Sequence, residues 1–151
     1  MKLARLTFLF LLASILMSCG SSSTPKPIDG AWRATLLNPD STTAYTFTTV
    51  FSQSTAPTVD VISFLFVTPV TCFPSPTGQS ATFSVTGHGG GFETGPFTMN
   101  VSTAFGTLVE NVLTLNGTRN SDGTISGTWT LTGLTGCSGS GSYSMQLLPS
   151  M

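Results

Sequence analysis

The stretch Phe97-Thr98-Met99-Asn100-Val101 decides the fold, because its apolar and polar side chains alternate with a period of two. This spacing is typical of a β-strand that buries one face and exposes the other. Residues 81–86 and 129–132 alternate in the same way. From Gly30 onward no stretch keeps the apolar spacing of a helix for long, so the sequence predicts an all-β fold.

Turn-forming residues divide the chain after Gly30 into eight predicted strands. These strands are expected at residues 30–37, 43–52, 58–68, 79–87, 95–104, 108–118, 124–133 and 141–148. Short strands at regular spacing favour an eight-stranded antiparallel up-and-down β-barrel, with a β-sandwich as the alternative.

The side chains expected on the inner face are aromatic or aliphatic. They are Trp32, Ala34, Leu36, Tyr45, Phe47, Phe83, Val85, Phe97, Met99, Val101, Leu113, Leu115, Trp129, Leu131, Tyr143, Met145 and Leu147. The candidates for lining a ligand are Trp32, Phe47, Phe83, Phe97, Met99, Trp129, Tyr143 and Met145. Because a barrel of this size either fills with such side chains or encloses one small ligand, both interpretations stay open.

An internal repeat supports the predicted strands. Residues 82–87 followed by 95–99 align without gaps on residues 128–133 followed by 141–145. Each copy has an aromatic strand, a glycine-rich loop and a Gly-x-aromatic-x-Met strand. We interpret the copies as equivalent hairpins that bury an aromatic side chain on the same register.

The strand expected at 58–68 is apolar on both faces. Ile62, Phe64 and Phe66 alternate there with Val61, Leu65 and Val67. The outer apolar side chains are therefore either covered by the following loop, residues 68–78, or exposed as a contact surface.

The N-terminus has the parts of an export signal. Lys2 and Arg5 precede an apolar run at residues 6–17, which is too short to cross a bilayer. The run ends on Leu16-Met17-Ser18-Cys19, which resembles the lipobox of bacterial lipoproteins. The resemblance implies a signal peptide at 1–18, a lipidated Cys19 with a flexible linker at 19–28, and a β-barrel domain at 29–151.

The lipobox resemblance also implies a location in the cell. Acyl chains on Cys19, palmitate among them, would anchor the mature chain to a membrane of the cell envelope. Gly20 differs from the aspartate associated with retention at the inner membrane, so we expect the outer membrane, at its periplasmic face or its surface.

Charged side chains are sparse in the mature chain. Three cations, Lys26, Arg33 and Arg119, face six carboxylates, for a net charge of −3. Nucleic acid binding needs several cations that neutralise phosphates, so it is not expected.

With Cys19 assigned to lipid, two cysteines remain. Cys72 and Cys137 most simply pair in an exported domain. In an up-and-down barrel both would follow odd-numbered strands and so lie at the same end. Their disulfide would fix the loop at 68–78 over the barrel mouth as a lid or plug.

Gly30-Ala31-Trp32 resembles the Gly-x-Trp opening of lipocalins and avidin-like barrels, together called calycins. In that group the tryptophan closes one barrel end, and an arginine from a late strand packs against it. The resemblance implies that Arg119 is the counterpart of that arginine, although the rest of the lipocalin pattern is absent.

Residues for catalysis or metal binding are scarce. His88 is the single histidine, and with Glu93 nearby it supplies two metal ligands where a zinc site usually needs three. The glycines around His88 precede a strand instead of the helix that a phosphate-binding loop requires. No pair of carboxylates and no serine elbow is placed for hydrolysis. We expect no enzyme activity, no metal and no cofactor.

These observations favour a non-enzymatic envelope lipoprotein that serves as a structural or interaction module. Its expected partners are the membrane, through the lipid anchor, and an envelope protein. The alternative is a carrier of a small apolar ligand inside the barrel.

Overall fold

The computed structural model describes residues 28–55, 58–67, 71–73, 77–83, 95–105 and 108–150. The strands are β1 (Gly30–Leu37), β2 (Thr43–Thr55), β3 (Thr58–Phe66), β4 (Thr77–Phe83), β5 (Gly95–Phe105), β6 (Leu108–Arg119), β7 (Ile125–Thr132) and β8 (Gly139–Leu147). Across the described ranges, no helix is long and apolar enough to cross a membrane.

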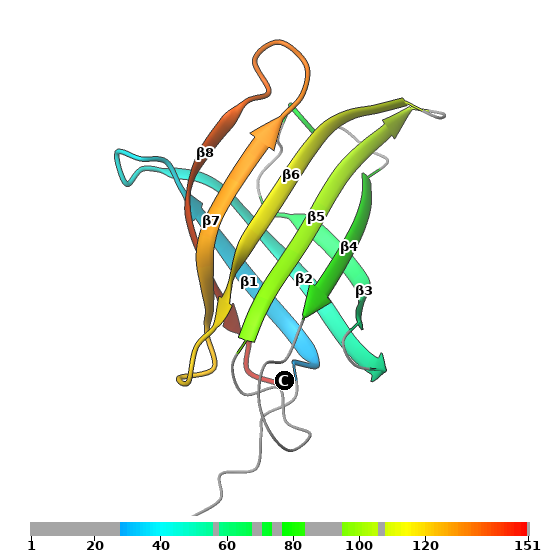
Figure 1. Cartoon of the computed structure of the whole chain (residues 1–151), viewed down its shortest axis with the longest axis vertical. Helices are drawn as coiled ribbons and strands as arrows, with labels where there is room; N and C mark the ends of the chain where they lie inside the picture. Colours follow the sequence, from blue (N-terminus) through cyan, green and yellow to red (C-terminus); the bar gives the residue numbers. More distant parts are fainter. Residues whose placement is uncertain are drawn as a thin grey trace, which may run out of the picture.

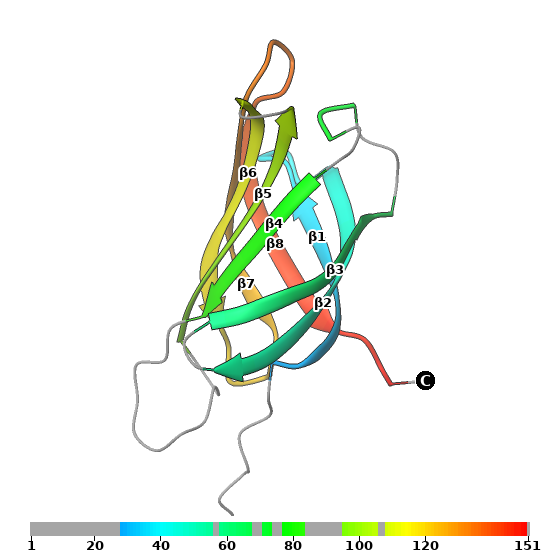
Figure 2. The same cartoon turned by 90° about the vertical axis from the view of Figure 1, so that its right-hand side faces the viewer.

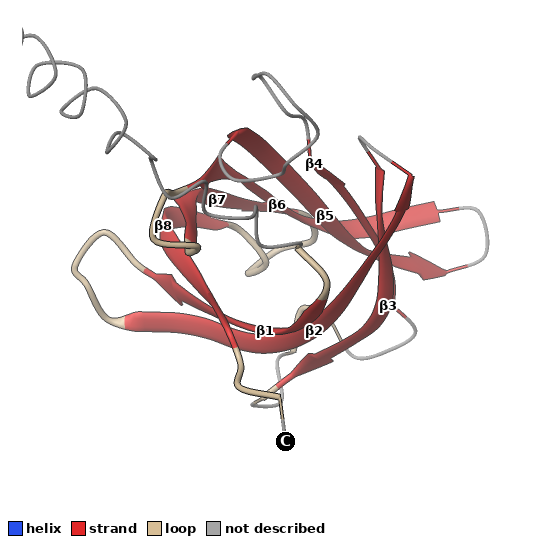
Figure 3. Ribbon diagram, turned by 90° about the horizontal axis from the view of Figure 1, so that it is seen from below, coloured by secondary structure: helices blue, strands red, loops and turns tan. Residues whose placement is uncertain are grey.

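All the strands belong to one antiparallel sheet that curls back on itself (Figure 1). Neighbours in sequence pair with each other, and β1 also pairs with β8, from Trp32 opposite Leu147 to Leu37 opposite Ser142. Seen along its axis, the sheet surrounds one interior (Figure 3). The prediction of an all-β antiparallel barrel or sandwich is confirmed, and the strands form one sheet instead of two stacked ones.

The contact between β3 and β4 is the shortest in the sheet. Only Thr58 with Thr82 and Val59 with Ala81 are paired, whereas β4 and β5 pair along the whole of β4. Figure 2 shows β3 and β4 diverging from this short contact.

The alternation that predicted the strands also places the core. Trp32, Ala34 and Leu36 of β1 are fully buried, and Arg33 between them is exposed. The same pattern holds on β5, where Phe97, Met99 and Val101 face inward. Because successive strand residues point to opposite faces, one register of each strand fills the interior.

Close approach of β6 and β7 requires glycine at one place. Gly117 pairs with Gly127, and a Cβ on either would overlap the backbone of the other strand. The Tyr143 ring of β8 also reaches Gly117, since an added Cβ there would meet its hydroxyl. Gly117 therefore provides the space in which the Tyr143 hydroxyl lies.

A β-bulge in β3 changes which side chains face inward. Val50 of β2 pairs with Ser63 of β3. The next pair is Phe51 with Val61, which leaves Ile62 as the extra residue.

The prediction that Ile62 shares a face with Phe64 and Phe66 is therefore wrong. Val61 packs against the core together with Phe64 and Phe66. Ile62 and Leu65 lie outside, where they are 64% and 68% exposed.

The interpretation of the internal repeat as equivalent hairpins is also wrong. Phe83 pairs with Phe97, whereas Trp129, the counterpart of Phe83, pairs with Gly141. The two copies lie three strands apart, and strand direction reverses at every strand. The β4–β5 and β7–β8 connections therefore lie at opposite ends of the barrel. The shared feature is that the aromatic residue of the second strand, Phe97 in one copy and Tyr143 in the other, is buried.

Two turns of the same construction join β1 to β2 and β6 to β7. In the first, the Asp40 carboxylate accepts hydrogen bonds from the amide and hydroxyl of Thr42, at 3.0 and 2.6 Å. In the second, Asp122 accepts the same pair of bonds from Thr124, at 2.8 and 2.7 Å. These donors hold the pKa of each carboxyl below its ordinary value of 3.8.

We predict that the Asp122→Asn variant loses less of its free energy of unfolding than the wild type does when the pH is lowered. Because the folded-state pKa of Asp122 is lowered, its contribution is complete above the ordinary value of 3.8 and is lost as the pH falls through the folded value. Asparagine keeps an acceptor but does not titrate there. Urea unfolding from about pH 6 to about pH 3 should give a flatter profile for the variant, and Thr124→Val should lie between the two. Identical profiles for Asp122→Asn and the wild type would refute this.

We predict that Gly127→Ala destabilises the fold by about 3 kcal/mol, because the new Cβ would overlap the backbone of Asn116 and Gly117. The control is Thr128→Ala on the exposed face of the same strand, which should cost less than about 1 kcal/mol. Denaturant unfolding measures both, and equal losses would show that β6 and β7 have room for a side chain.

Candidate functional site

The barrel interior and its two ends form the candidate site. We call the end where β1 begins and β8 ends the Trp32 end, and the end where β7 turns into β8 the Trp129 end.

Aromatic rings fill the described interior. Their contacts, by centroid distance, are Trp32–Phe51 at 6.3 Å, Phe51–Phe97 at 5.8 Å, Phe47–Phe64 at 4.7 Å, Phe47–Phe66 at 6.1 Å and Tyr45–Phe66 at 6.2 Å. Most of these are tilted or edge-on pairs, the arrangements that aromatic rings prefer. Inner side chains in mutual contact favour a packed core over an open cavity.

At the Trp129 end the indole ring lies over β8. Its Nε1 donates to the carbonyl oxygen of Leu37 at 2.9 Å, and its edge meets the Tyr45 ring at 5.6 Å. Gly139 and Gly141 leave room for the ring, because a Cβ on either would contact it. Trp129 thereby closes part of this barrel mouth.

The segment 71–73 lies folded against the same end. Cys72 and Cys137 form a disulfide with a Cα–Cα distance of 5.6 Å, so the predicted pairing is confirmed. Cys72 and Phe73 are both buried, and the Phe73 ring stacks on Phe66 at 5.1 Å. This part of the predicted lid is therefore in place, while residues 68–70 and 74–76 lie outside the described residues.

Asn111 of β6 connects the segment 71–73 to the barrel. Its side-chain nitrogen donates to the carbonyl oxygen of Cys72 at 2.7 Å, and its side-chain oxygen accepts from the amide of Leu134 at 2.9 Å. Its own amide donates to the hydroxyl of Thr103 at 3.0 Å. Asn111 is buried, so these bonds satisfy polar groups that water does not reach.

At the other end Trp32 lies at the centre of the closure. Its Nε1 donates to the carbonyl oxygen of Ile28 at 2.7 Å. The Arg119 guanidinium carbon lies 5.9 Å from the centre of the Trp32 ring, and Arg119 is only 2% exposed. The expected contact between Arg119 and Trp32 is therefore present, with the geometry of a cation–π interaction.

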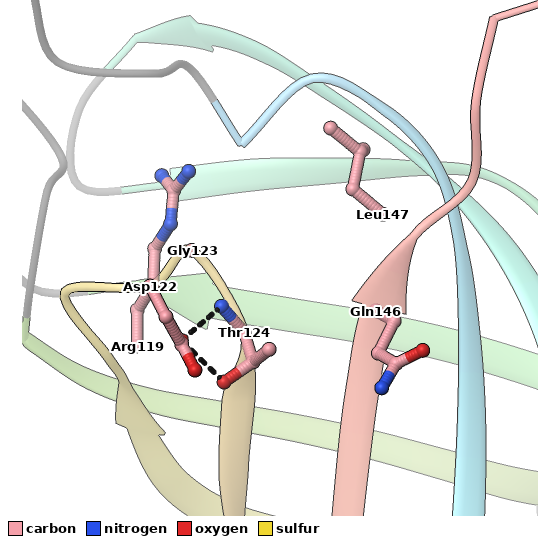
Figure 4. A pocket seen from close by; sticks show the side chains of 6 residues that line it. All are labelled: Arg119, Asp122, Gly123, Thr124, Gln146 and Leu147. Carbon is pink, nitrogen blue, oxygen red and sulfur yellow. Dashed lines mark hydrogen bonds between the residues drawn. The ribbon is translucent and has the colours of Figure 1, made fainter.

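A pocket of about 240 Å³ opens beside this end. It is lined by Arg119, Asp122, Gly123, Thr124, Gln146 and Leu147 (Figure 4). The Asp122 carboxylate is bonded to Thr124, and the Arg119 guanidinium points away from it. Because both charged groups interact with the chain itself, the pocket has little with which to bind a charged ligand.

The Tyr143 side chain places a buried hydroxyl in the interior. Among the described residues its hydroxyl has no hydrogen-bond partner, although the ring is almost fully buried. Desolvation raises the pKa of Tyr143 above its ordinary value of 10, so the hydroxyl stays neutral. A buried hydroxyl of this kind can donate to an acceptor but does not act as a base near neutral pH.

Most predicted interior residues lie where they were expected. The buried ligand-lining candidates are Trp32, Phe47, Phe97, Met99, Trp129, Tyr143 and Met145. Leu147 is a correction: it is 44% exposed, because it ends β8 at the barrel rim and has no further strand residue beyond it. The side chain of Phe83, together with Cys19, Val85, His88 and Glu93, lies outside the described residues.

Sequence reasoning did not identify Asn111. A lone asparagine between Glu110 and Val112 looks like a solvated strand residue, and its position on the inner register was the available signal. Its partners are 39 and 23 residues away, so no local motif reveals them.

Within the described part of the chain, no three histidine, cysteine, aspartate or glutamate side chains come together as metal ligands. Comparisons with protein-family models, with curated proteins and with solved structures find no match.

We predict that Asn111→Ala destabilises the domain by about 3 kcal/mol, because the Cys72 carbonyl and the Leu134 amide both lose their partner. Asn116→Ala is the matched control, since Asn116 lies on the exposed face of β6 and should cost about 0.5 kcal/mol or less. Denaturant unfolding of both variants with the disulfide intact measures the difference. Similar losses would mean that Asn111 does not fix the segment 71–73.

Proposed function

We propose that this chain is a lipid-anchored protein of the bacterial cell envelope whose barrel is a non-enzymatic structural or interaction module. One observation carries the proposal: the chain's own side chains fill the described interior and cover both ends. Trp32 with Arg119 covers one end, and Trp129 with the disulfide-fixed segment 71–73 covers the other. A partner would then be recognised by the outer surface of the barrel.

The finer architecture in this proposal is a closed, eight-stranded, up-and-down barrel of the lipocalin-like kind. The pairing of β1 with β8 supports closure, and the Arg119–Trp32 contact matches what the Gly-x-Trp resemblance implies. The likeness concerns architecture and does not extend to ligand transport.

Anchoring at Cys19 is the second part of the proposal. The charged start, short apolar run and lipobox-like tetrapeptide support acylation, and residues 20–27 supply a linker rich in serine and proline. The outer membrane is the expected site, with the barrel tethered at its periplasmic face or its surface.

A carrier of a small apolar ligand is the second candidate function. The observation that favours it is the Tyr143 hydroxyl, which is buried in the interior without a partner among the described residues. A ligand with a hydrogen-bond acceptor would satisfy that donor.

Native mass spectrometry of the mature protein, purified from its own host in detergent, tests both parts. We expect the mass of the chain from Cys19 onward plus its acyl groups, and no other small molecule. The Cys19→Ser variant should lack the acyl mass, whereas a Cys72→Ser, Cys137→Ser double variant should keep it.

Each part can fail separately. A mature chain without acyl groups would overturn the lipoprotein assignment. A stoichiometric small molecule that remains in the delipidated protein would overturn the module and establish the carrier.

A further inference from the structure

The outer wall of the barrel has two chemically different sides. On the β5–β8 side the outward residues bear hydroxyl or amide groups almost throughout. They include Thr98, Asn100, Thr114, Asn116, Thr128 and Thr130. Two of the amides are fixed by neighbouring threonines, Asn116 by Thr98 at 3.1 Å and Asn100 by Thr114 at 2.9 Å. This side is a hydrated surface.

The opposite side, formed outside β1, β2 and β3, also bears outward hydroxyls, Thr48 and Ser63 among them, but it adds exposed aliphatic side chains. Ile62 is 64% exposed and Leu65 is 68% exposed, and Val67 just beyond β3 is 52% exposed. We call the outward residues Arg33, Val50, Ile62, Leu65 and Val67 the β1–β3 face. Aliphatic side chains gathered on one wall of an otherwise hydroxyl-rich barrel indicate a contact surface.

The chain from the proposed lipid anchor reaches the barrel next to this face. Gly30, the first residue of β1, pairs with Phe51, and Phe51 pairs with Val61. Gly30 and Val61 are thus two strand spacings apart, about 10 Å. Ile62 follows Val61 directly, so the tether begins at the edge of the β1–β3 face.

The tether is long enough to let this face meet the bilayer. Residues 19–27, which precede the buried Ile28, could extend over at most about 30 Å, which exceeds the distance from Gly30 to the β1–β3 face. A domain tethered this closely stays near the membrane surface, so even a weak contact is repeatedly sampled.

The cationic side chain of Arg33, on β1, is exposed on the same face. Arg33 is exposed and pairs with Thr48, and Thr48 pairs with Leu65, so one row of the sheet leads from the guanidinium to the aliphatic group. Arg33 also lines a pocket of about 220 Å³ with the hydroxyls of Thr35 in β1 and Ser144 in β8, so this pocket lies at the border between the two walls. Guanidinium and hydroxyl donors together suit a phosphate group.

Charge on this face is compatible with a lipid headgroup layer. Asp60 is the single carboxylate of β1, β2 and β3, and it lies at the start of β3, two residues before Ile62. Arg119, the other arginine of the mature chain, is buried against Trp32. The exposed arginine and the two most exposed aliphatic side chains, Ile62 and Leu65, therefore share one wall, whereas Leu134, 55% exposed, lies apart between β7 and β8.

We propose that the β1–β3 face lies on the headgroup layer of the membrane to which Cys19 is anchored, with Arg33 bound to a lipid phosphate and Ile62 and Leu65 inserted beneath it. The proposal rests on the proposed lipid anchor. It adds an orientation: the barrel lies on its side, and the hydroxyl-rich β5–β8 wall faces water and any protein partner.

Quenching by brominated lipid tests this orientation. The lipidated protein is reconstituted in phosphatidylethanolamine–phosphatidylglycerol vesicles, with Leu65→Trp and Thr130→Trp as matched variants on opposite walls. Because interfacial side chains reach roughly 5–10 Å into the headgroup region, the Leu65→Trp signal should fall by about half when the acyl chains are brominated. The Thr130→Trp signal should stay unchanged, after subtraction of the emission of Trp32 and Trp129 in the wild type.

The acyl mass and the co-sedimentation of the protein with vesicles are measured on the same samples. Anchored protein with no quenching at Leu65→Trp, or with equal quenching at Thr130→Trp, overturns the orientation and leaves the anchor standing. A Leu65→Trp side chain shielded from aqueous acrylamide but not quenched by lipid identifies a second copy or another protein on this face and also overturns it. Absence of acyl mass overturns both proposals. Ile62→Trp provides the same readout if Leu65→Trp does not fold.

Discussion

The structure depends on filling the inside of a curled sheet with the side chains of one register. A curled sheet of this size encloses a fixed volume. Rings as large as indoles therefore fit only where a neighbouring strand has glycine and leaves space for them. Gly139 and Gly141 leave space for the Trp129 ring, and Gly117 leaves space for the Tyr143 side chain. The indole nitrogens of Trp32 and Trp129 each donate to a backbone carbonyl, so the two largest interior side chains bury no unsatisfied donor.

The same constraint explains why so few charges are needed. Several polar groups are satisfied by uncharged partners within the chain: Asn111 bonds the segment 71–73, and Asp40 and Asp122 each bond a threonine of their own turn. The buried cation is stacked on an aromatic ring. With stability supplied by packing and by these bonds, the outer wall is free to differ from one side to the other. The fold does not require the exposed aliphatic side chains of the β1–β3 face.

Alternation in the sequence was sufficient to predict the β class, the inward residues of β1 and β5, and the approximate strand boundaries, because a period of two reports directly on burial. The cysteine pair could also be predicted, since only two cysteines remained once Cys19 was assigned to lipid, and the Arg119–Trp32 contact was implied by the Gly-x-Trp resemblance. The bulge at Ile62 could not be predicted, because it arises from the pairing of β3 with β2 and leaves no mark in a strand that is apolar on both faces. Asn111 escaped for a similar reason, as its partners lie far away in sequence.

The matching turns at Asn38–Thr42 and Asn120–Thr124 did have a sequence signal. Both read Asn-x-Asp-x-Thr, and both place the residue before the threonine at positive φ, Ser41 at 67° and Gly123 at 87°. A β-branched residue would be strained at that position.

A carrier has to admit and release its ligand, which bears on the choice between the two functions. At the Trp129 end the segment 71–73 is fixed by a disulfide, by the Phe73–Phe66 stack and by Asn111. The disulfide links Cys72 covalently to Cys137, so the segment 71–73 cannot move far from this end without reduction. At the Trp32 end, entry would require Arg119 to leave the ring of Trp32 and its buried position. The described side chains at both ends therefore hinder the entry of a ligand, which favours the proposed module over the proposed carrier. Under that proposal, recognition depends on the difference between the two outer walls.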